Sequence, residues 1–213
     1  MNDNIGRRFL EEVDSYVKNN LPTLTCMQVY DFYYRFFYDL KKFKGNSNGF
    51  TGLSEYLIFR SLYHLLGGSF ESRKVSGSNW INEFVSIDNN QFRIGQGVPV
   101  NINGKKLYPD IIVYKDDRLR SVAQIKLYLT SGIKELITEM EKYKALIAKY
   151  GYVKAFLIVF GLSKEGKIFP HLRELQDKEP WFNFVILENN ENLIITMLTN
   201  GLGLKELIGS NNK

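Results

Sequence analysis

Three polar residues interrupt two apolar segments in the middle of the chain, and together they could bind a metal and act on a phosphate. Asp110 follows Pro109 within the first segment, and Gln124 and Lys126 alternate with apolar residues in the second. Side chains of a strand alternate between its two faces, so Gln124 and Lys126 point the same way. An acid, an amide and an ammonium group therefore converge near the centre of a sheet. Polar groups there are costly unless they satisfy one another or do chemistry.

Two strands are needed to bring these three residues together. Residues 107–114 and 122–128 are rich in β-branched and aromatic residues, which favour strands. The polar residues 115–118 between them are typical of a turn. We therefore expect a β-hairpin or two adjacent strands.

A helix expected over residues 53–66 carries a fourth candidate, Glu55, in the middle of its apolar face. Glu55 is in the first turn, where a carboxylate can satisfy backbone N–H groups and the helix dipole. Alternatively, it reaches the sheet and joins Asp110 at a metal. The other side of the helix is a polar arc, on which His64 is expected at the surface. The residues of this arc are Ser54, Arg60, Ser61 and His64.

Hydrophobic periodicity and turn residues place the remaining elements. Asn103-Gly104 predicts a type I′ hairpin turn, and Gly151 is placed to end a long helix. The expected helices cover residues 8–18, 25–40, 53–66, 133–150 and part of 191–208. The expected strands cover residues 80–87, 91–94, 98–102, 107–114, 122–128, 153–160 and 182–187.

Length and composition are those of a globular protein with a sizeable core. Of the 213 residues, 44% are hydrophobic and 24% are charged, which is ordinary for a soluble protein. The single cysteine, Cys26, excludes an internal disulfide, and no apolar run is long enough to span a bilayer. We therefore expect a cytoplasmic protein. Loop residues 45–49 predict a boundary between an N-terminal helical region, residues 1–48, and an α/β core with a C-terminal extension, residues 49–213.

The helix expected over residues 25–40 is crowded with aromatic residues, and Lys41, Lys42 and Lys44 follow it. One interpretation is a stacking and phosphate-binding surface for nucleic acid. The other is a helix buried on most sides, with a solvated run of charge at its end.

Pro109-Asp110 and Gln124-x-Lys126 resemble the motif of the PD-(D/E)xK nuclease superfamily, which includes restriction endonucleases, junction resolvases and repair exonucleases. Gln124 stands where the family has a second acid, and Lys126 stands where it has its lysine. The resemblance covers residues 51–160, where the expected order of elements matches the family's core. It implies an α/β fold with a restriction-endonuclease-like αβββαβ core, in which helices flank a central mixed sheet.

The resemblance also implies a metal-dependent DNA endonuclease. Mg²⁺ or Mn²⁺ would be held by Asp110, by Glu55 and by the carbonyl oxygen of Gln124, because these are hard oxygen ligands. Lys126 would hold the attacking water or neutralise the charge that develops on the phosphate. The implied catalytic residues are Asp110, Gln124, Lys126 and Glu55.

A further pair lies on the long helix. Glu139 and Tyr143 are four residues apart, so they share a face that could lie over the site. They resemble the QxxxY element of some exonucleases of the family, with Glu in place of Gln. An acid there could replace the charge lost at Gln124. The simpler interpretation is a solvated Glu139 beside a core Tyr143.

Double-stranded DNA is the expected partner, and the net charge of +5 permits it. Double-strand cutters usually need two active sites, so by analogy a homodimer is plausible. Two other interpretations stay open: a catalytically impaired nuclease-fold protein that binds nucleic acid without cutting, and an α/β protein in which Lys126 forms a buried salt bridge with Asp110. The basic residues that flank the motif, and are candidates for phosphate contacts, are Lys105, Lys106, Arg118 and Arg120.

Overall fold

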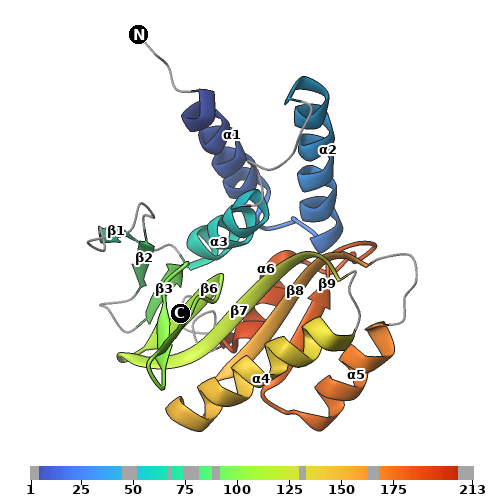
Figure 1. Ribbon diagram of the computed structural model, residues 1–213. Helices are drawn as coiled ribbons and strands as arrows, with labels where there is room; N and C mark the ends of the chain where they lie inside the picture. Colours follow the sequence, from blue (N-terminus) through green and yellow to red (C-terminus); the bar gives the residue numbers. More distant parts are fainter. Residues whose placement is uncertain are drawn as a thin grey trace.

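The computed structural model describes residues 5–44, 52–66, 69–73, 82–87, 92–129, 133–162 and 168–205. The boundary expected at residues 45–49 lies outside these ranges. Within them, the chain forms an α/β structure in which helices cover both faces of a mixed sheet (Figure 1). None of the helices in this part of the chain combines the length and apolar character that crossing a bilayer requires.

Seven strands form the central sheet in the order β1-β2-β3-β6-β7-β8-β9. The strands from β1 to β7 pair antiparallel, whereas β7, β8 and β9 run parallel, which confirms the expected mixed sheet. Strands β4 and β5 form a separate antiparallel pair. The strand bounds are β1 Ser69–Arg73, β2 Asn82–Ile87, β3 Phe92–Gln96, β4 Val100–Ile102, β5 Lys105–Leu107, β6 Ile111–Lys115, β7 Arg118–Leu129, β8 Lys154–Leu162 and β9 Phe182–Ile186.

Two aspartates close the hairpin that carries the candidate motif. Asp116 and Asp117 adopt φ angles of 49° and 61°, and β6 and β7 pair immediately on either side of them. This is the two-residue connection that matches the twist of the strands. The turn predicted at Asn103-Gly104 is confirmed, because both residues have positive φ angles, 48° and 80°.

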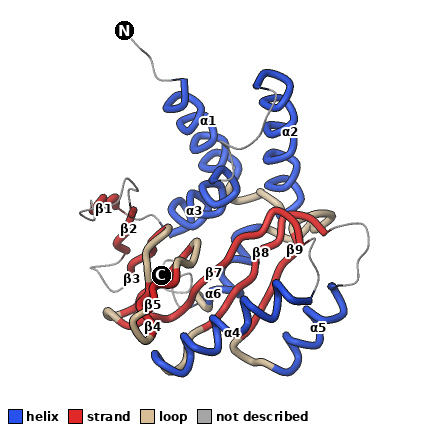
Figure 2. Tube along the Cα trace, in the orientation of Figure 1, coloured by secondary structure: helices blue, strands red, loops and turns tan. Residues whose placement is uncertain are grey.

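Two hydrophobic cores lie on opposite faces of the sheet. On one face, helices α1, α2, α3 and α6 contribute to the core that contains Ile111, Ala123 and Phe156. On the other, α4 and α5 contribute to the core that contains Ile112 and Val122 (Figure 2). Successive strand residues thus serve opposite cores. The helix bounds are α1 Ile5–Asn20, α2 Cys26–Lys44, α3 Gly52–Leu66, α4 Ile133–Tyr150, α5 Ile168–Lys178 and α6 Ile194–Leu202.

The aromatic residues of α2 pack mainly against other aromatic residues. Phe32 stacks on Tyr16 of α1 with ring centroids 4.3 Å apart, and Tyr33 packs edge-on against Phe160 of β8. Tyr33 is 2% exposed. These contacts support the interpretation of α2 as a packed helix. The side chains of the lysines that end this helix lie outside the described part of the molecule.

The polar arc of α3 is buried against α1. Asp14 of α1 bonds Arg60 through Oδ1, and the same oxygen lies 2.7 Å from Nε2 of His64. Arg60 is 8% exposed, and the His64 side chain is 13% exposed. The prediction of a surface His64 is therefore wrong. Asp14, which is distant in sequence, compensates the charges of Arg60 and His64. The periodicity of the helix alone assigns these side chains to solvent.

Candidate active site

Asp110 lies directly before β6, and two groups of β7 bond its carboxylate. Its Oδ2 accepts a hydrogen bond from Nε2 of Gln124 (2.5 Å) and one from the backbone N–H of Ile125 (2.6 Å). The register of the two strands, which pairs Ile111 with Ala123, brings these groups together. The acid and the amide of the motif thus form one hydrogen-bonded unit.

Lys126 meets an acid from α4. Its Nζ lies 3.8 Å from Oε1 of Glu139, and Nζ of Lys142 lies 2.8 Å from the same oxygen. The Glu139 side chain is only 10% exposed. The expectation of a solvated Glu139 is therefore wrong, whereas that of a core Tyr143, which is 4% exposed, is confirmed. Helix α4 lies across one face of the sheet (Figure 1), and its Glu139 reaches Lys126 of β7.

Glu55 reaches the site from α3. Its carboxylate forms a hydrogen bond with the side chain of Gln96, the last residue of β3, and burial raises its pKa. Gln96 pairs with Ile111 across the sheet, so it lies next to the start of β6. The charge of Glu55 also acts on Asp110. Of the two roles considered for Glu55, contact with the sheet is the one that these interactions support.

The cluster carries more negative than positive charge. Burial raises the pKa of Asp110 to about 7, and the carboxylates of Glu55 and Glu139 add to this rise. The N–H of Ile125 and the ammonium group of Lys126 act in the opposite direction without cancelling it. A carboxylate held in this way gains stability from any cation that binds beside it.

A buried hydroxyl group also faces the cluster. The hydroxyl oxygen of Tyr143 is buried and has no hydrogen-bond partner among the described residues. Burial raises the pKa of this phenol, and the charges of Glu139 and Asp110 raise it further. Buried polar atoms of folded proteins nearly always have a partner, which can be an ordered water or a ligand oxygen.

These residues fit a divalent metal of the magnesium type. The described residues contain no group of three or more acidic, histidine or cysteine side chains close enough to enclose a metal. Magnesium does not need such a cage, since it commonly binds through one or two carboxylates and keeps several waters. The undercompensated charge of Asp110 and the unbonded hydroxyl of Tyr143 are consistent with a hydrated cation.

Two of the four basic residues expected to contact DNA, Arg118 and Arg120, lie along β7 away from this cluster. Arg118 and Arg120 are exposed at the beginning of β7. At about 3.3 Å per residue they lie roughly 20 and 13 Å along the strand from Gln124. Lys105 and Lys106 are exposed on β5, in a hairpin that contacts the last turn of α4. A substrate would need to extend along the sheet to reach them.

Two residues of the cluster were missed by sequence analysis. Gln96 is a polar residue at the end of the apolar strand β3, and its position near an expected strand end was the available signal. Lys142 follows Glu139 by three residues, a spacing at which opposite charges pair on a helix.

Comparisons with known proteins give no match: no family model, no curated protein and no solved structure is similar to this chain. What the cluster can do therefore follows from its own chemistry. Carboxylates that favour a cation lie beside ammonium groups that favour a phosphate.

Proposed function

We propose that this protein is a metal-dependent nuclease that hydrolyses phosphodiester bonds of DNA in the manner of the PD-(D/E)xK superfamily. The observation that carries the proposal is the cluster in which Asp110, Gln124 and Lys126 meet the buried acid Glu139. The order of elements supports it. Helix α3 precedes the antiparallel strands β3, β6 and β7, and α4 then leads to β8, which is parallel to β7. Strands β1 and β2 stand between α3 and β3 in the same sheet, so the elements from β3 to β8 are consistent with the αβββαβ order that the resemblance implies, with two strands added before them.

Asp110 is the residue around which Mg²⁺ or Mn²⁺ would be held. Glu55 would contribute a second carboxylate and Gln124 its carbonyl oxygen. When bound there, the metal would supply positive charge to activate water and to stabilise the charge developing on the phosphate. The chain holds these oxygens on two strands and a helix, so their positions are fixed before a substrate binds.

Glu139 provides the negative charge that Gln124 lacks. Its carboxylate is mostly buried, so its interactions are weakened less by water than those of a surface acid. It lies between the ammonium groups of Lys126 and Lys142. In the proposed reaction Glu139 orients Lys126, which holds the attacking water or faces the phosphate.

Cleavage assays test the proposal. Linear and supercoiled double-stranded DNA is incubated with the full chain and Mg²⁺, Mn²⁺ or a chelator, and the products are separated by size. We expect products only with metal, and we expect Lys126→Met to lower the rate roughly a hundredfold, because one lost group that stabilises transition-state charge typically costs that much. Lys18→Met, on an exposed position of α1, is the matched control. A wild-type chain that cuts no DNA with either metal would refute the proposal.

A nuclease-fold protein that binds nucleic acid without cutting is the second candidate. The observation that favours it is that Gln124 turns its amide N–H, and not its carbonyl oxygen, toward the Asp110 carboxylate. Such a protein would bind DNA with steep salt dependence and show no cleavage. Replacing two of the exposed basic residues by Ala should lower the slope of log affinity against log salt by about one unit per lost phosphate contact. An unchanged slope would place the DNA surface elsewhere. The residues to test are Lys105, Lys106, Arg118 and Arg120.

A further inference from the structure

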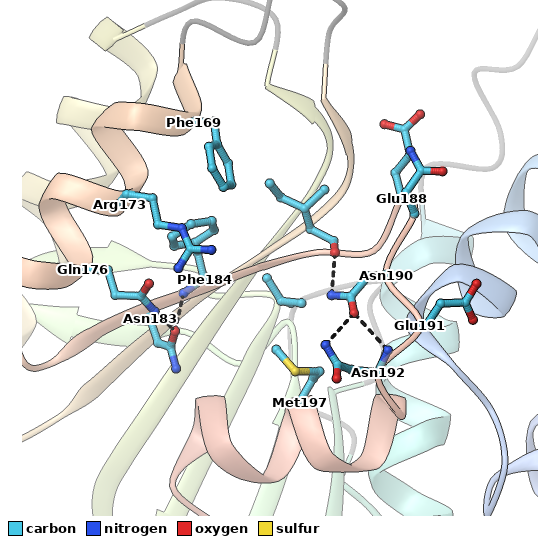
Figure 3. Close-up of a pocket in the computed structure, with 13 residues that line it drawn as sticks. Phe169, Arg173, Gln176, Asn183, Phe184, Glu188, Asn190, Glu191, Asn192 and Met197 are labelled. Atoms are coloured by element: carbon cyan, nitrogen blue, oxygen red, sulfur yellow. Dashed lines mark hydrogen bonds between the residues drawn. The ribbon is translucent and has the colours of Figure 1, made fainter.

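Strand β9 is the last strand of the described sheet, and a groove of about 650 Å³ follows its outer edge. Figure 3 shows the groove between α5, which contributes Arg173, and α6, which contributes Met197. The loop after β9 contributes Glu188 and Glu191. The outer edge of a sheet presents backbone N–H and C=O groups that another strand can bond.

The hydrogen bonds of β9 show which of its backbone groups point outward. The N–H of Leu187 bonds β8, so the alternate residues Phe184 and Ile186 direct their backbone groups away from β8. The N–H of Phe184 donates a hydrogen bond of 2.8 Å to Oδ1 of Asn183. The C=O of Ile186 accepts one of 2.9 Å from Nδ2 of Asn190. The C=O of Phe184 and the N–H of Ile186 have no such cap among the described residues. On these two residues, one acceptor and one donor thus remain on the edge.

The two ends of the groove carry opposite charge. Arg173 lies beside the first half of β9, with its guanidinium group over the rings of Phe169 and Phe184, at 5.2 and 5.6 Å from the ring centroids. Glu188 and Glu191 lie beyond the last residue of β9 (Figure 3). A two-fold axis across the edge would bring the positive end of one copy to the negative end of the other.

We infer that this edge is the interface of a homodimer in which β9 pairs antiparallel with β9 of a second copy. With the two-fold axis at Val185, Phe184 of each copy lies opposite Ile186 of the partner subunit. The uncapped N–H of one Ile186 then donates to the uncapped C=O of the other copy's Phe184, and the axis produces this bond twice.

A second copy suits this edge better than other occupants do. Glu188 and Glu191 repel a nucleic-acid backbone. In a two-fold symmetric dimer, by contrast, Arg173 of each copy comes near the acidic end of the groove of the other copy. The register places Phe184 level with Gln124 but two strands away from it. Dimerisation would therefore leave the acidic cluster of each copy uncovered. The inference rests on the edge alone and does not depend on the proposed nuclease chemistry.

Charge exchange tests the interface in the full chain. Sedimentation equilibrium should give twice the mass of one chain for the wild type. Arg173→Glu and Glu191→Arg should each raise the dimer dissociation constant roughly tenfold or more, because each change affects both symmetric contacts. Combining the two changes should restore the dimer. Lys18→Glu has the same charge change as Arg173→Glu at an exposed position of α1, and it should leave the dimer intact.

Ile186→Pro tests the backbone pairing separately. Proline removes the outward N–H, and proline is tolerated at edge positions whose N–H faces solvent. We expect a folded monomer by sedimentation and circular dichroism. A wild-type chain that is monomeric at all concentrations would overturn the inference, and so would a dimer that survives both Arg173→Glu and Ile186→Pro. Failure of the double charge variant to restore the dimer would also count against it. None of these outcomes depends on DNA cleavage, so the two proposals can fail independently.

Discussion

Asp14 and Asp110 are both partly buried aspartates with basic neighbours, yet their pKa values shift in opposite directions. Burial acts to raise the pKa of Asp14, but hydrogen bonds and charges from Arg60 and His64 outweigh it and lower the pKa. Burial raises the pKa of Asp110 to about 7, and its hydrogen bond from Ile125 does not offset this. Similar side chains thus have very different surroundings within one chain.

The difference lies in the balance of charge around each carboxylate. Asp14 meets two basic groups, whereas Asp110 has two other carboxylates and one ammonium group nearby. The first arrangement is complete and holds α1 on α3. In the second, the surroundings disfavour the charged form of the carboxylate, which is typical of sites that bind or react. We therefore interpret Asp14 as structural and Asp110 as functional, and four predictions test this contrast.

Asp110→Asn should have the largest effect. The asparagine oxygen can still accept the hydrogen bonds from Gln124 and Ile125, so the fold should remain. Loss of the carboxylate removes the central metal ligand, and metal-dependent cleavage should fall by about a thousandfold, or about 4 kcal/mol in the barrier. Rates are measured at saturating Mg²⁺, and stability by urea unfolding. A variant that keeps wild-type cleavage would place the active site elsewhere.

Asp14→Asn should affect stability and leave cleavage intact. It removes the negative charge from a mostly buried contact with Arg60 and His64, at a cost of about 2 kcal/mol. Asp177→Asn, at an exposed position of α5, should change stability by less than about 0.5 kcal/mol. Urea unfolding of both variants gives the comparison. If Asp14→Asn behaved like the surface control, the structural role assigned to Asp14 would be wrong.

Gln124→Glu tests whether the residue beside Asp110 helps to bind a metal. The substitution replaces the amide that donates a hydrogen bond to Asp110 with a second carboxylate, so the metal-free variant should be less stable than the wild type. Added charge should raise Mg²⁺ affinity about tenfold, which is about 1.4 kcal/mol. Calorimetric titration measures the affinity. Gln28→Glu, on α2, adds the same charge away from the cluster as a control. Lower stability with no gain in metal affinity would contradict the shared-metal model.

Part of the site could be predicted because it depends on local rules. Alternation along β7 puts Gln124 and Lys126 on one face. Their register with Asp110 depends in addition on a shift of one residue between Val113 and Tyr114, which the short turn does not determine. The burial of Glu139 could not be predicted in this way. It depends on how α4 crosses the sheet, which no spacing within the helix determines. The same limit applies to Arg60, whose partner Asp14 comes from a separate helix.

Part of the fold could also be predicted from local sequence patterns. The turn residues and the apolar runs predicted the strands β6, β7 and β8 and the helix that ends at Gly151, which has a φ angle of 78°. Gly201 is a residue type that disfavours the interior of a helix. In the structure it lies inside α6, where a Cβ atom would come within 2.4 Å of the Phe156 ring. The glycine is therefore required by close packing on β8, a long-range contact that is invisible in sequence.

The fourth prediction concerns the pH dependence of stability, and here the two aspartates should act in opposite directions. The pKa of Asp110 is about 7 in the folded protein and 3.8 in the unfolded chain. Between these values the folded state binds more protons, so the free energy of unfolding falls as pH rises through this window. Asp14 has a lowered pKa, so its stabilising contribution is present above pH 3.8 and is lost as pH falls through its folded value.

Asp110→Asn isolates the first of these effects because asparagine does not titrate. Below the unfolded pKa of 3.8, Asp110 is neutral in both states, and the variant and the wild type should be about equally stable. As pH rises towards the folded pKa of about 7, the wild type should become progressively less stable than the variant. Urea unfolding of both proteins in metal-free buffer across this range measures the gap. Mg²⁺ should narrow it at the upper end, because a bound cation stabilises the charged carboxylate of the folded wild type but not the asparagine. Parallel pH curves would show that Asp110 is compensated in the folded protein as fully as Asp14 is, and the contrast between the two clusters would then fail.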